Sequence, residues 1–118
     1  MKDHASVVRV SRHQPTDGRR DEVAGLLKAI AESMRDAPGC FGAQVTSSNR
    51  DGAELVLISR WESGDAMEKY NAQPEFTGFQ REVKTSLAGP PDVEVFTTAA
   101  TMLPPGGPWC ELRSPPLT

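Results

Sequence analysis

The hydrophobic and polar positions along the chain follow two periods, that of a strand and that of a helix. Residues 6–13 are rich in β-branched side chains and alternate over part of their length, which predicts a first strand. Between Val23 and Met34 apolar residues recur at helical spacing, with charged residues opposite them. This pattern predicts a helix of about five turns, which the pair at 38–39, proline and glycine, ends.

The centre of the chain is predicted to be a hairpin. Residues 40–48 are the expected second strand, and 49–52 carry the Asn, Asp and Gly of a turn. A third strand then ends at Trp61, and its unbroken apolar run at 55–58 indicates burial on both faces. Strand geometry assigns its side chains to two faces: Leu55, Leu57, Ser59 and Trp61 on one, and Val56, Ile58, Arg60 and Glu62 on the other.

A second helix and a fourth strand complete the pattern. The helix is predicted to begin near Ser63, with Ser63 or Asp65 as its N-cap, and to be interrupted before Pro74. The apolar face of its later part is formed by Phe76, Phe79, Val83 and Leu87. Residues 89–91 end it, and 92–100 are the expected last strand. Residues 103–118 are rich in proline and are expected to be an extended or disordered tail.

The predicted order β-α-β-β-α-β is that of a ferredoxin-like α+β domain over residues 1–102, with a four-stranded antiparallel sheet. Two helices cover only one face of such a sheet. Val56 and Ile58 point to the other face, joined by Val8 and Val10 or by Val7, depending on register. Because an apolar face of that size is unusual on a monomer, we expect a homodimer in which two sheets pack face to face.

Charge, apolar runs and cysteine spacing argue against several classes of protein. The net charge of −3 and pI near 5.3 argue against nucleic acid or an anionic membrane surface as partner. No run of about 18 apolar residues and no signal-peptide pattern is present in the sequence, so a soluble, cytoplasmic protein is expected. Cys40 and Cys110 have the spacing of neither a disulfide framework nor a metal site.

Several of these features together resemble the antibiotic biosynthesis monooxygenase family over residues 7–100. They are the stop at 38–39, the sequence Arg-Trp-Glu-Ser at 60–63 and the break at 89–91. Within the family the chain looks most like the small oxygenases of aromatic polyketide pathways. The resemblance implies a dimeric α+β barrel that oxidises a phenolic or anthrone-type polyketide to a quinone with dioxygen. It also implies that no flavin, haem or metal cofactor takes part.

The same resemblance implies site residues. Trp61 matches the pocket tryptophan of the family, and Arg81 matches an arginine beside the substrate, where a guanidinium would stabilise an oxyanion. Leu57 and Met67 stand where the polyketide oxygenases have asparagine and tyrosine. The expected substrate-binding residues are Leu57, Ser59, Met67 and Phe79.

Three polar groups are candidates for the proton transfer that this chemistry needs. Tyr70 and Asn71 lie about one helical turn beyond Met67 and could replace the missing polar groups. His13, at the end of the first strand, titrates near neutrality and is a candidate general base. Each candidate also has a structural reading: Trp61 as a core aromatic, and the others as exposed polar groups.

Other functions remain open at this stage. A haem-degrading branch of the family uses a histidine on the second helix, but residues 63–89 contain no histidine or cysteine. A polyketide cyclase or isomerase would need positioning and proton transfer but no dioxygen, which suits the apolar Leu57 and Met67. A non-catalytic binding or chaperone protein is the third alternative.

Overall fold

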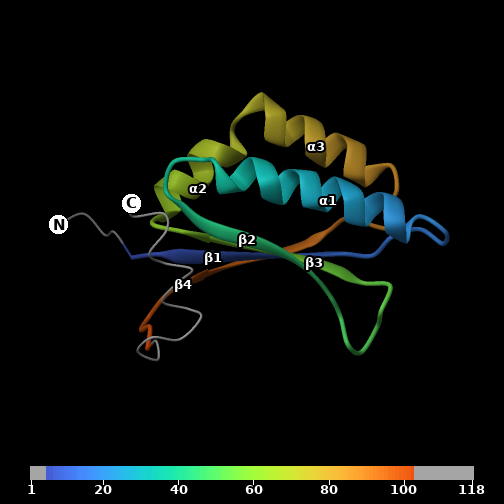
Figure 1. The fold of residues 1–118 in the computed structure, drawn as a ribbon, viewed down its shortest axis with the longest axis horizontal. Coiled ribbons are helices and arrows are strands. Elements are labelled where there is room, and N and C mark those ends of the chain that lie inside the picture. The colour runs from blue at the N-terminus through green and yellow to red at the C-terminus, as the bar shows by residue number, and fades with distance from the viewer. Residues whose placement is uncertain (1–4, 103–118) are drawn as a thin grey trace.

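The computed structural model describes residues 5–102, which form a four-stranded antiparallel sheet with three helices on one of its faces (Figure 1). The predicted proline-rich tail, with Trp109 and Cys110, lies outside the described residues. The elements in chain order are β1 (Val7–His13), α1 (Arg20–Arg35), β2 (Cys40–Ser47), β3 (Leu55–Trp61), α2 (Gly64–Asn71), α3 (Pro74–Lys84) and β4 (Asp92–Thr97). The strand order is β2-β3-β1-β4. The predicted ferredoxin-like fold is therefore confirmed.

The helices begin and end where local chemistry requires. Val23, Leu27, Ile30 and Met34 are the buried residues of α1. The side chain of Ser63 caps α2 by accepting from the backbone N–H of Ala66 at 3.2 Å, and Pro74 opens α3 at a position that needs no N–H donor.

Gly39 is required where α1 turns into β2. Its φ is +81°, and a Cβ built there would lie 2.7 Å from the Cβ of Ala66, inside any allowed contact. The carbonyl of Gly39 also accepts from the backbone N–H of Glu62 at 2.8 Å. The glycine therefore lets the end of α1 approach the start of α2 closely.

Two predicted boundaries were wrong. The helix was expected to continue through Leu87, but α3 ends at Lys84 and Leu87 instead forms a bridge with Pro15. The backbone N–H of Ala88 donates to the carbonyl of Gln14 at 2.7 Å, which draws this segment toward the end of β1 and prevents further helix. The last strand, β4, ends at Thr97 rather than at residue 100.

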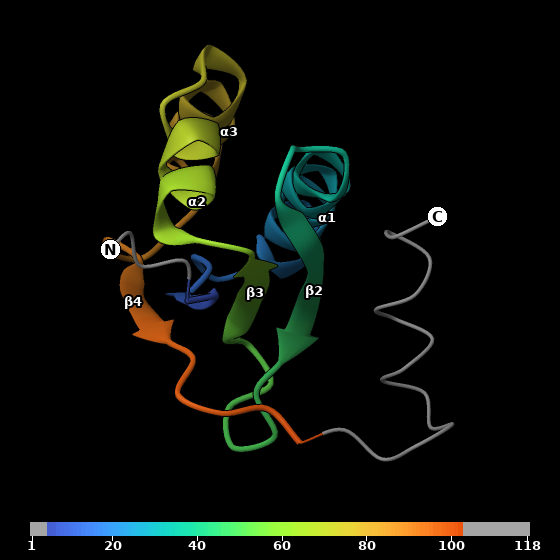
Figure 2. The same cartoon turned by 90° about the vertical axis from the view of Figure 1, so that its left-hand side faces the viewer.

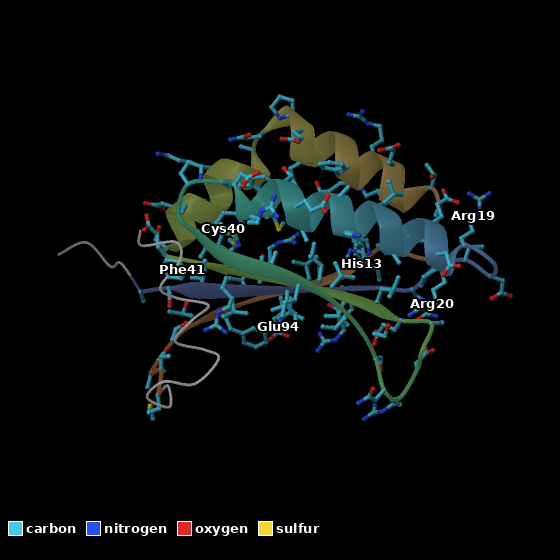
Figure 3. The ribbon with its side chains drawn as sticks, in the orientation of Figure 1. His13, Arg19, Arg20, Cys40, Phe41 and Glu94 are labelled. Carbon is cyan, nitrogen blue, oxygen red and sulfur yellow. The ribbon has the colours of Figure 1, made fainter. Side chains whose placement is uncertain are left out.

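The sheet has one face covered by the helices and one open face (Figure 2), and the register assigns the side chains to them. Alternate side chains of β1, namely those of Val7, Arg9, Ser11 and His13, lie on the helix face beside Trp61, Ser59, Leu57 and Leu55 of β3. Val8 and Val10 lie on the opposite face with Val56 and Ile58, which settles the choice of register left open by the sequence. Figure 3 shows the same division, with His13 on the helix side and Glu94 of β4 on the open side.

Candidate functional site

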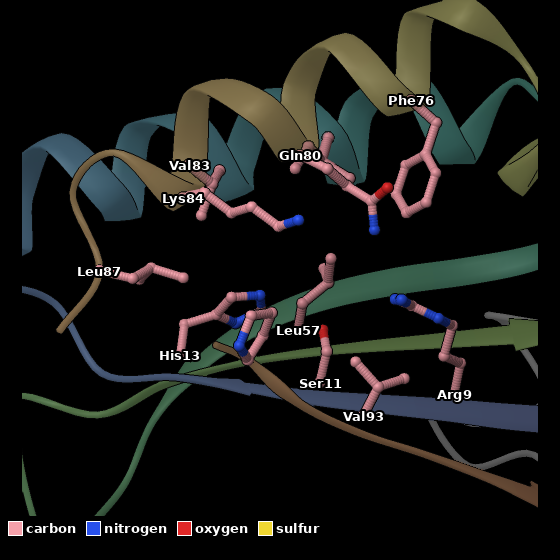
Figure 4. Close-up of a pocket in the computed structure, with 12 residues that line it drawn as sticks. Arg9, Ser11, His13, Leu57, Phe76, Gln80, Val83, Lys84, Leu87 and Val93 are labelled. Carbon is pink, nitrogen blue, oxygen red and sulfur yellow. The ribbon is translucent and has the colours of Figure 1, made fainter. Parts of the chain in front are cut away.

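A narrow pocket lies on the helix face of the sheet, between α3 and the strands β1 and β4 (Figure 4). The pocket is small: its enclosed volume is about 30 Å³, room for about one or two water molecules, so a larger ligand requires the lining side chains to move apart. The lining residues are Arg9, Ser11, His13, Ile30, Leu57, Phe76, Gln80, Val83, Lys84, Leu87, Pro91 and Val93.

The two long walls of the pocket follow from the periods of their elements. On β1, every second side chain faces the helices, which aligns Arg9, Ser11 and His13 in one row. On α3, residues three and four apart share a face, so Phe76, Gln80 and Val83 line the opposite wall. The wall formed by β1 is therefore polar, and the wall formed by α3 is apolar apart from the amide of Gln80.

Arg9 is a buried cation, with 7% of its surface exposed. Its guanidinium carbon lies 5.5 Å from the centroid of the Phe76 ring, within cation–π range. Burial lowers the pKa of Arg9 below its ordinary value, but a guanidinium stays protonated in proteins. Within residues 5–102, Arg9 forms no ion pair with a carboxylate and no side-chain hydrogen bond.

Ser11 is the next side chain along the row and is 1% exposed. Among the described residues, its Oγ has no hydrogen-bond partner. Because buried hydroxyls are almost always hydrogen-bonded, this orphaned group marks the pocket as a place where a polar ligand atom would fit.

His13 closes the row and is 6% exposed. Its Nδ1 lies 3.4 Å from the carbonyl oxygen of Leu55, and since a carbonyl can only accept, this long contact places the proton on Nδ1. Burial lowers the pKa of His13, and the charge of Arg9 adds to this shift, whereas hydrogen bonds to the backbone of Leu55 and of Ser11 oppose it. His13 is therefore neutral at neutral pH, and with the proton on Nδ1 the lone pair lies on Nε2.

An aromatic row lies behind the pocket. The ring centroids of Trp61 and Tyr70 are 5.6 Å apart, and those of Tyr70 and Phe76 are 5.2 Å apart. Trp61 is fully buried, and its indole N–H donates to the Oγ of Ser59 at 2.9 Å. The hydroxyl of Tyr70 donates to the Oγ of Ser33 at 2.8 Å, and burial raises its pKa. Only Phe76 of this row lines the pocket.

The structure brings two of the predicted site residues, His13 and Leu57, to the pocket. The side chains of Met67 and Phe79 lie in or against the core, and Arg81 is exposed on α3. Asn71 lies at the end of α2 with a buried Oδ1 that has no partner among the described residues.

Sequence reasoning missed four polar lining residues: Arg9, Ser11, Gln80 and Lys84. The available signal was the alternation of the first strand, because placing Val8 and Val10 on the open face puts Arg9, Ser11 and His13 together on the other. Polar residues at three successive inward positions of a strand indicate a site rather than a core.

Two features are absent from the part of the chain that the structure describes. No helix within 5–102 has the length and apolar character needed to cross a membrane. The same residues contain no group of three or more His, Cys, Asp or Glu side chains arranged to hold a metal ion.

The fold and its pocket define the class of the protein: a ferredoxin-like α+β domain with a small, partly polar pocket between the sheet and the helices. Residues 6–82 match the model of the family described as antibiotic biosynthesis monooxygenase. The chain belongs to this family, as the sequence features had indicated.

Relatives agree with this assignment. The chain is 29% identical over 87 residues to Rv0793 of Mycobacterium tuberculosis, a candidate monooxygenase, covering 74% of this chain and 85% of that protein. The solved structure of Rv0793 superposes with a TM-score of 0.76 at 26% identity, over 82% of this chain and 98% of the other.

A second solved structure is that of a mutant of SnoaB from Streptomyces nogalater, a cofactor-independent oxygenase. It shares the fold with a TM-score of 0.74 at 20% identity, over 83% of this chain and 97% of the other. A candidate antibiotic biosynthesis monooxygenase from Deinococcus radiodurans shares it with a TM-score of 0.77 at 17% identity, over 85% and 99% of the two chains.

Proposed function

We propose that this protein is a cofactor-independent monooxygenase that oxidises a phenolic or anthrone-type aromatic polyketide to a quinone with dioxygen. One observation carries the proposal: a neutral, buried histidine and a buried guanidinium line the same narrow pocket. His13 can accept a proton there, and Arg9 can stabilise the negative charge that the proton leaves behind.

The substrate supplies the redox chemistry. An unperturbed phenol ionises at about pH 10, so near neutral pH deprotonation needs a base and a cationic or hydrogen-bonding neighbour. The resulting anion transfers an electron to dioxygen, and the two radicals combine to a peroxide on the ring carbon. Loss of water then leaves a carbonyl: one CH₂ group and one O₂ become one C=O group and one H₂O.

The protein's contribution is to hold and enclose the substrate. Apolar side chains of the pocket, among them Leu57, Val83 and Leu87, offer contact to a flat hydrocarbon body. A site of low water content strengthens the interaction between a developing anion and Arg9, because charges interact more strongly at low dielectric. Because the enclosed volume is about 30 Å³, entry of a ring system requires the lining side chains to move apart.

The direct test is turnover of an anthrone by purified, metal-stripped protein under air. We expect one O₂ consumed per quinone formed, with a mass gain of one oxygen and loss of two hydrogens. His13→Gln should lose most of this activity while keeping its fold. A wild-type protein that consumes no oxygen with any anthrone tested, or an unaffected His13→Gln, would contradict the proposal.

A cyclase or isomerase is the second candidate, and the position of Leu57 favours it. Leu57 lines the pocket, where related polyketide oxygenases have an asparagine. Cyclisation needs proton transfer but no dioxygen, so His13 beside the apolar side chain of Leu57 is sufficient for it. A product of unchanged mass, or of a mass lower by one water, formed equally well without air would identify this reaction.

We further propose that two copies pair through their open sheet faces. This face carries Val8, Val10, Val56 and Ile58 at its centre, and Phe96 of β4, 45% exposed, beside them. Packing of a second sheet would remove this apolar surface from water. The ligand pocket lies on the other side of the sheet, so each subunit would keep its own.

A further inference from the structure

We infer that Arg9 and Ser11 form an oxyanion-binding subsite, so that the ligand of this pocket is an aromatic anion. This inference deepens the proposed function and rests on it for the reaction, but it concerns binding and is tested separately. The family resemblance assigned the anion to Arg81, which the structure places on the exposed side of α3.

The first argument is the state of Arg9. A buried guanidinium normally pairs with a carboxylate or donates hydrogen bonds to carbonyls, because leaving a buried charge without hydrogen-bond acceptors is costly. Within residues 5–102 its head group has no protein acceptor, lies over the face of Phe76 at 5.5 Å, and keeps some exposure of its nitrogens toward the solvent-open part of the pocket. A ring face attracts the cation but does not accept its in-plane N–H groups in the manner of an oxygen. These donors are therefore available for a ligand oxygen.

The second argument is independent and concerns Ser11. Its Oγ is buried and has no partner among the described residues, although it lines the pocket. Ser11 is two residues from Arg9 on the same strand face, so the two Cα atoms are about 7 Å apart. The long arginine side chain can span that distance, and one oxyanion can then accept from both groups.

The third argument is the charge around the pocket. Of the side chains that line it in the described structure, Arg9 and Lys84 are cationic and none is acidic. Figure 4 shows the amide of Gln80 and the ammonium of Lys84 directed into the same space from α3. A chain of net charge −3 thus presents a locally positive pocket, which attracts anions.

These positions also orient the ligand. Arg9 and His13 are four residues apart on β1, about 14 Å along the strand. A planar ligand with its anionic oxygen near Arg9 and Ser11 would extend along the strand toward His13. The group that loses a proton to Nε2 of His13 then lies at the opposite end from the bound oxyanion.

The shared chemistry is a delocalised oxyanion on an aromatic body, and either a carboxylate or a phenolate can supply it. A carboxylate is tested with 2-naphthoate, and its neutral isostere 2-naphthalenemethanol is the comparison. Calorimetry measures the binding of both compounds. Neither compound is an anthrone, so no turnover interferes. We expect wild-type protein to bind the anion at least tenfold more tightly than the alcohol, as expected for a charge-assisted hydrogen bond.

The phenolate source is tested with 2-naphthol, whose ionised and neutral forms differ in absorbance. Binding to an oxyanion site should lower the apparent pKa of the bound naphthol by about one unit or more, equivalent to a tenfold preference for the anion. A preference for naphthoate without a shift for naphthol would assign the subsite to carboxylates, and the reverse result would assign it to phenolates. Absence of both preferences in the wild-type protein would overturn the inference.

Variants place the subsite. Arg9→Met removes the charge at similar length, Arg9→Lys keeps the charge without the fork, and Ser11→Ala removes the hydroxyl. The matched control is Arg12→Met, on the opposite face of the same strand, where Arg12 is half exposed and 4.0 Å from Asp92. We expect Arg9→Met to abolish the preference for the anion, Arg9→Lys and Ser11→Ala to reduce it severalfold, and Arg12→Met to preserve it.

An anion preference that survives in folded Arg9→Met would contradict the assignment to Arg9. If Arg9→Met does not fold, the comparison of Arg9→Lys and Ser11→Ala with Arg12→Met decides it. Oxygen uptake on anthrones without any anion preference would remove this inference and the role of Arg9 in the proposed function, and would leave the oxygenation itself. Anion binding without oxygen uptake would remove the proposed oxygenation and leave the subsite.

Discussion

The guanidinium carbon of Arg9, on the central strand β1, lies 5.5 Å from the centroid of the Phe76 ring at the start of α3. This contact joins the two walls of the pocket and continues into the core, since the Phe76 ring is itself 5.2 Å from that of Tyr70. It offsets part of the desolvation of the buried charge while leaving the N–H donors of Arg9 without acceptors among the described residues. A cation held in this way is preorganised for a ligand anion.

Replacing Phe76 by leucine should weaken both the fold and the pocket. Phe76 is almost fully buried, and loss of ring contacts with Arg9 and Tyr70 should reduce the free energy of unfolding by about 1–2 kcal/mol. Urea denaturation measures this change. The affinity for 2-naphthoate should fall in the same variant; an unchanged affinity would show that Phe76 does not help to position Arg9.

Ser59→Ala should destabilise the protein without affecting its chemistry. Ser59 accepts the buried indole N–H of Trp61, so the substitution leaves that donor unpaired at a cost of about 1–3 kcal/mol. We expect a lower thermal midpoint and, below that temperature, a kcat/KM within about twofold of wild type. A large fall in kcat/KM in the folded variant would mean that Trp61 or Ser59 contacts the substrate, as the family resemblance implied.

The titration of His13 should affect both activity and stability. Burial keeps its pKa below the ordinary value of about 6.5, and the charge of Arg9 acts in the same direction. As general base His13 must be neutral, so kcat/KM should rise with pH through a value below 6.5 and then remain level. Lys84 also faces this pocket and adds a second cation to its lining.

The stability effect follows from linkage. Because the unfolded chain binds the His13 proton more tightly than the folded one, stability is fully present above about pH 6.5 and is lost as pH falls through the lowered pKa. The difference in unfolding free energy between wild type and His13→Gln should therefore vary in that window and be constant above it. A difference independent of pH would contradict the lowered pKa.

Ile58→Glu should prevent pairing of the open sheet faces. Ile58 is near the centre of the face without helices, where two copies would each present a buried carboxylate to the other. Analytical ultracentrifugation should show a dimer for wild type and a monomer for this variant. Gln73→Glu, which adds the same charge at an exposed position between α2 and α3, is the control. A monomeric wild type at micromolar concentration would contradict the proposed dimer.

The fold was predictable because each element carries its own signal. The four apolar positions buried by α1 recur at helical spacing, Ser63 caps α2, and Pro74 marks the start of α3. The end of α3 was not predictable, since it depends on the bridge from Leu87 to Pro15, a contact distant in sequence. A helix end that is determined by a tertiary contact leaves no pattern in the neighbouring sequence.

The site was less predictable than the fold. His13 was a candidate because histidine titrates near neutrality, and it does line the pocket, whereas Arg9 in isolation resembles any arginine on a half-exposed strand. Its burial depends on the pairing of β1 with β3 and β4 and on the position of Phe76 above it. Trp61, the strongest signal of the resemblance, lies in the core beneath Tyr70 rather than at the pocket.

The most direct test of this account is oxygen uptake on an anthrone by wild type, Arg9→Met and Arg81→Gln at equal folded concentration. We predict quinone formation by wild type, a loss of tenfold or more in kcat/KM for Arg9→Met, and a much smaller change for Arg81→Gln. A protein that retains its activity without Arg9 but loses it without Arg81 would contradict the site described, and wild type without oxygen uptake would contradict the reaction.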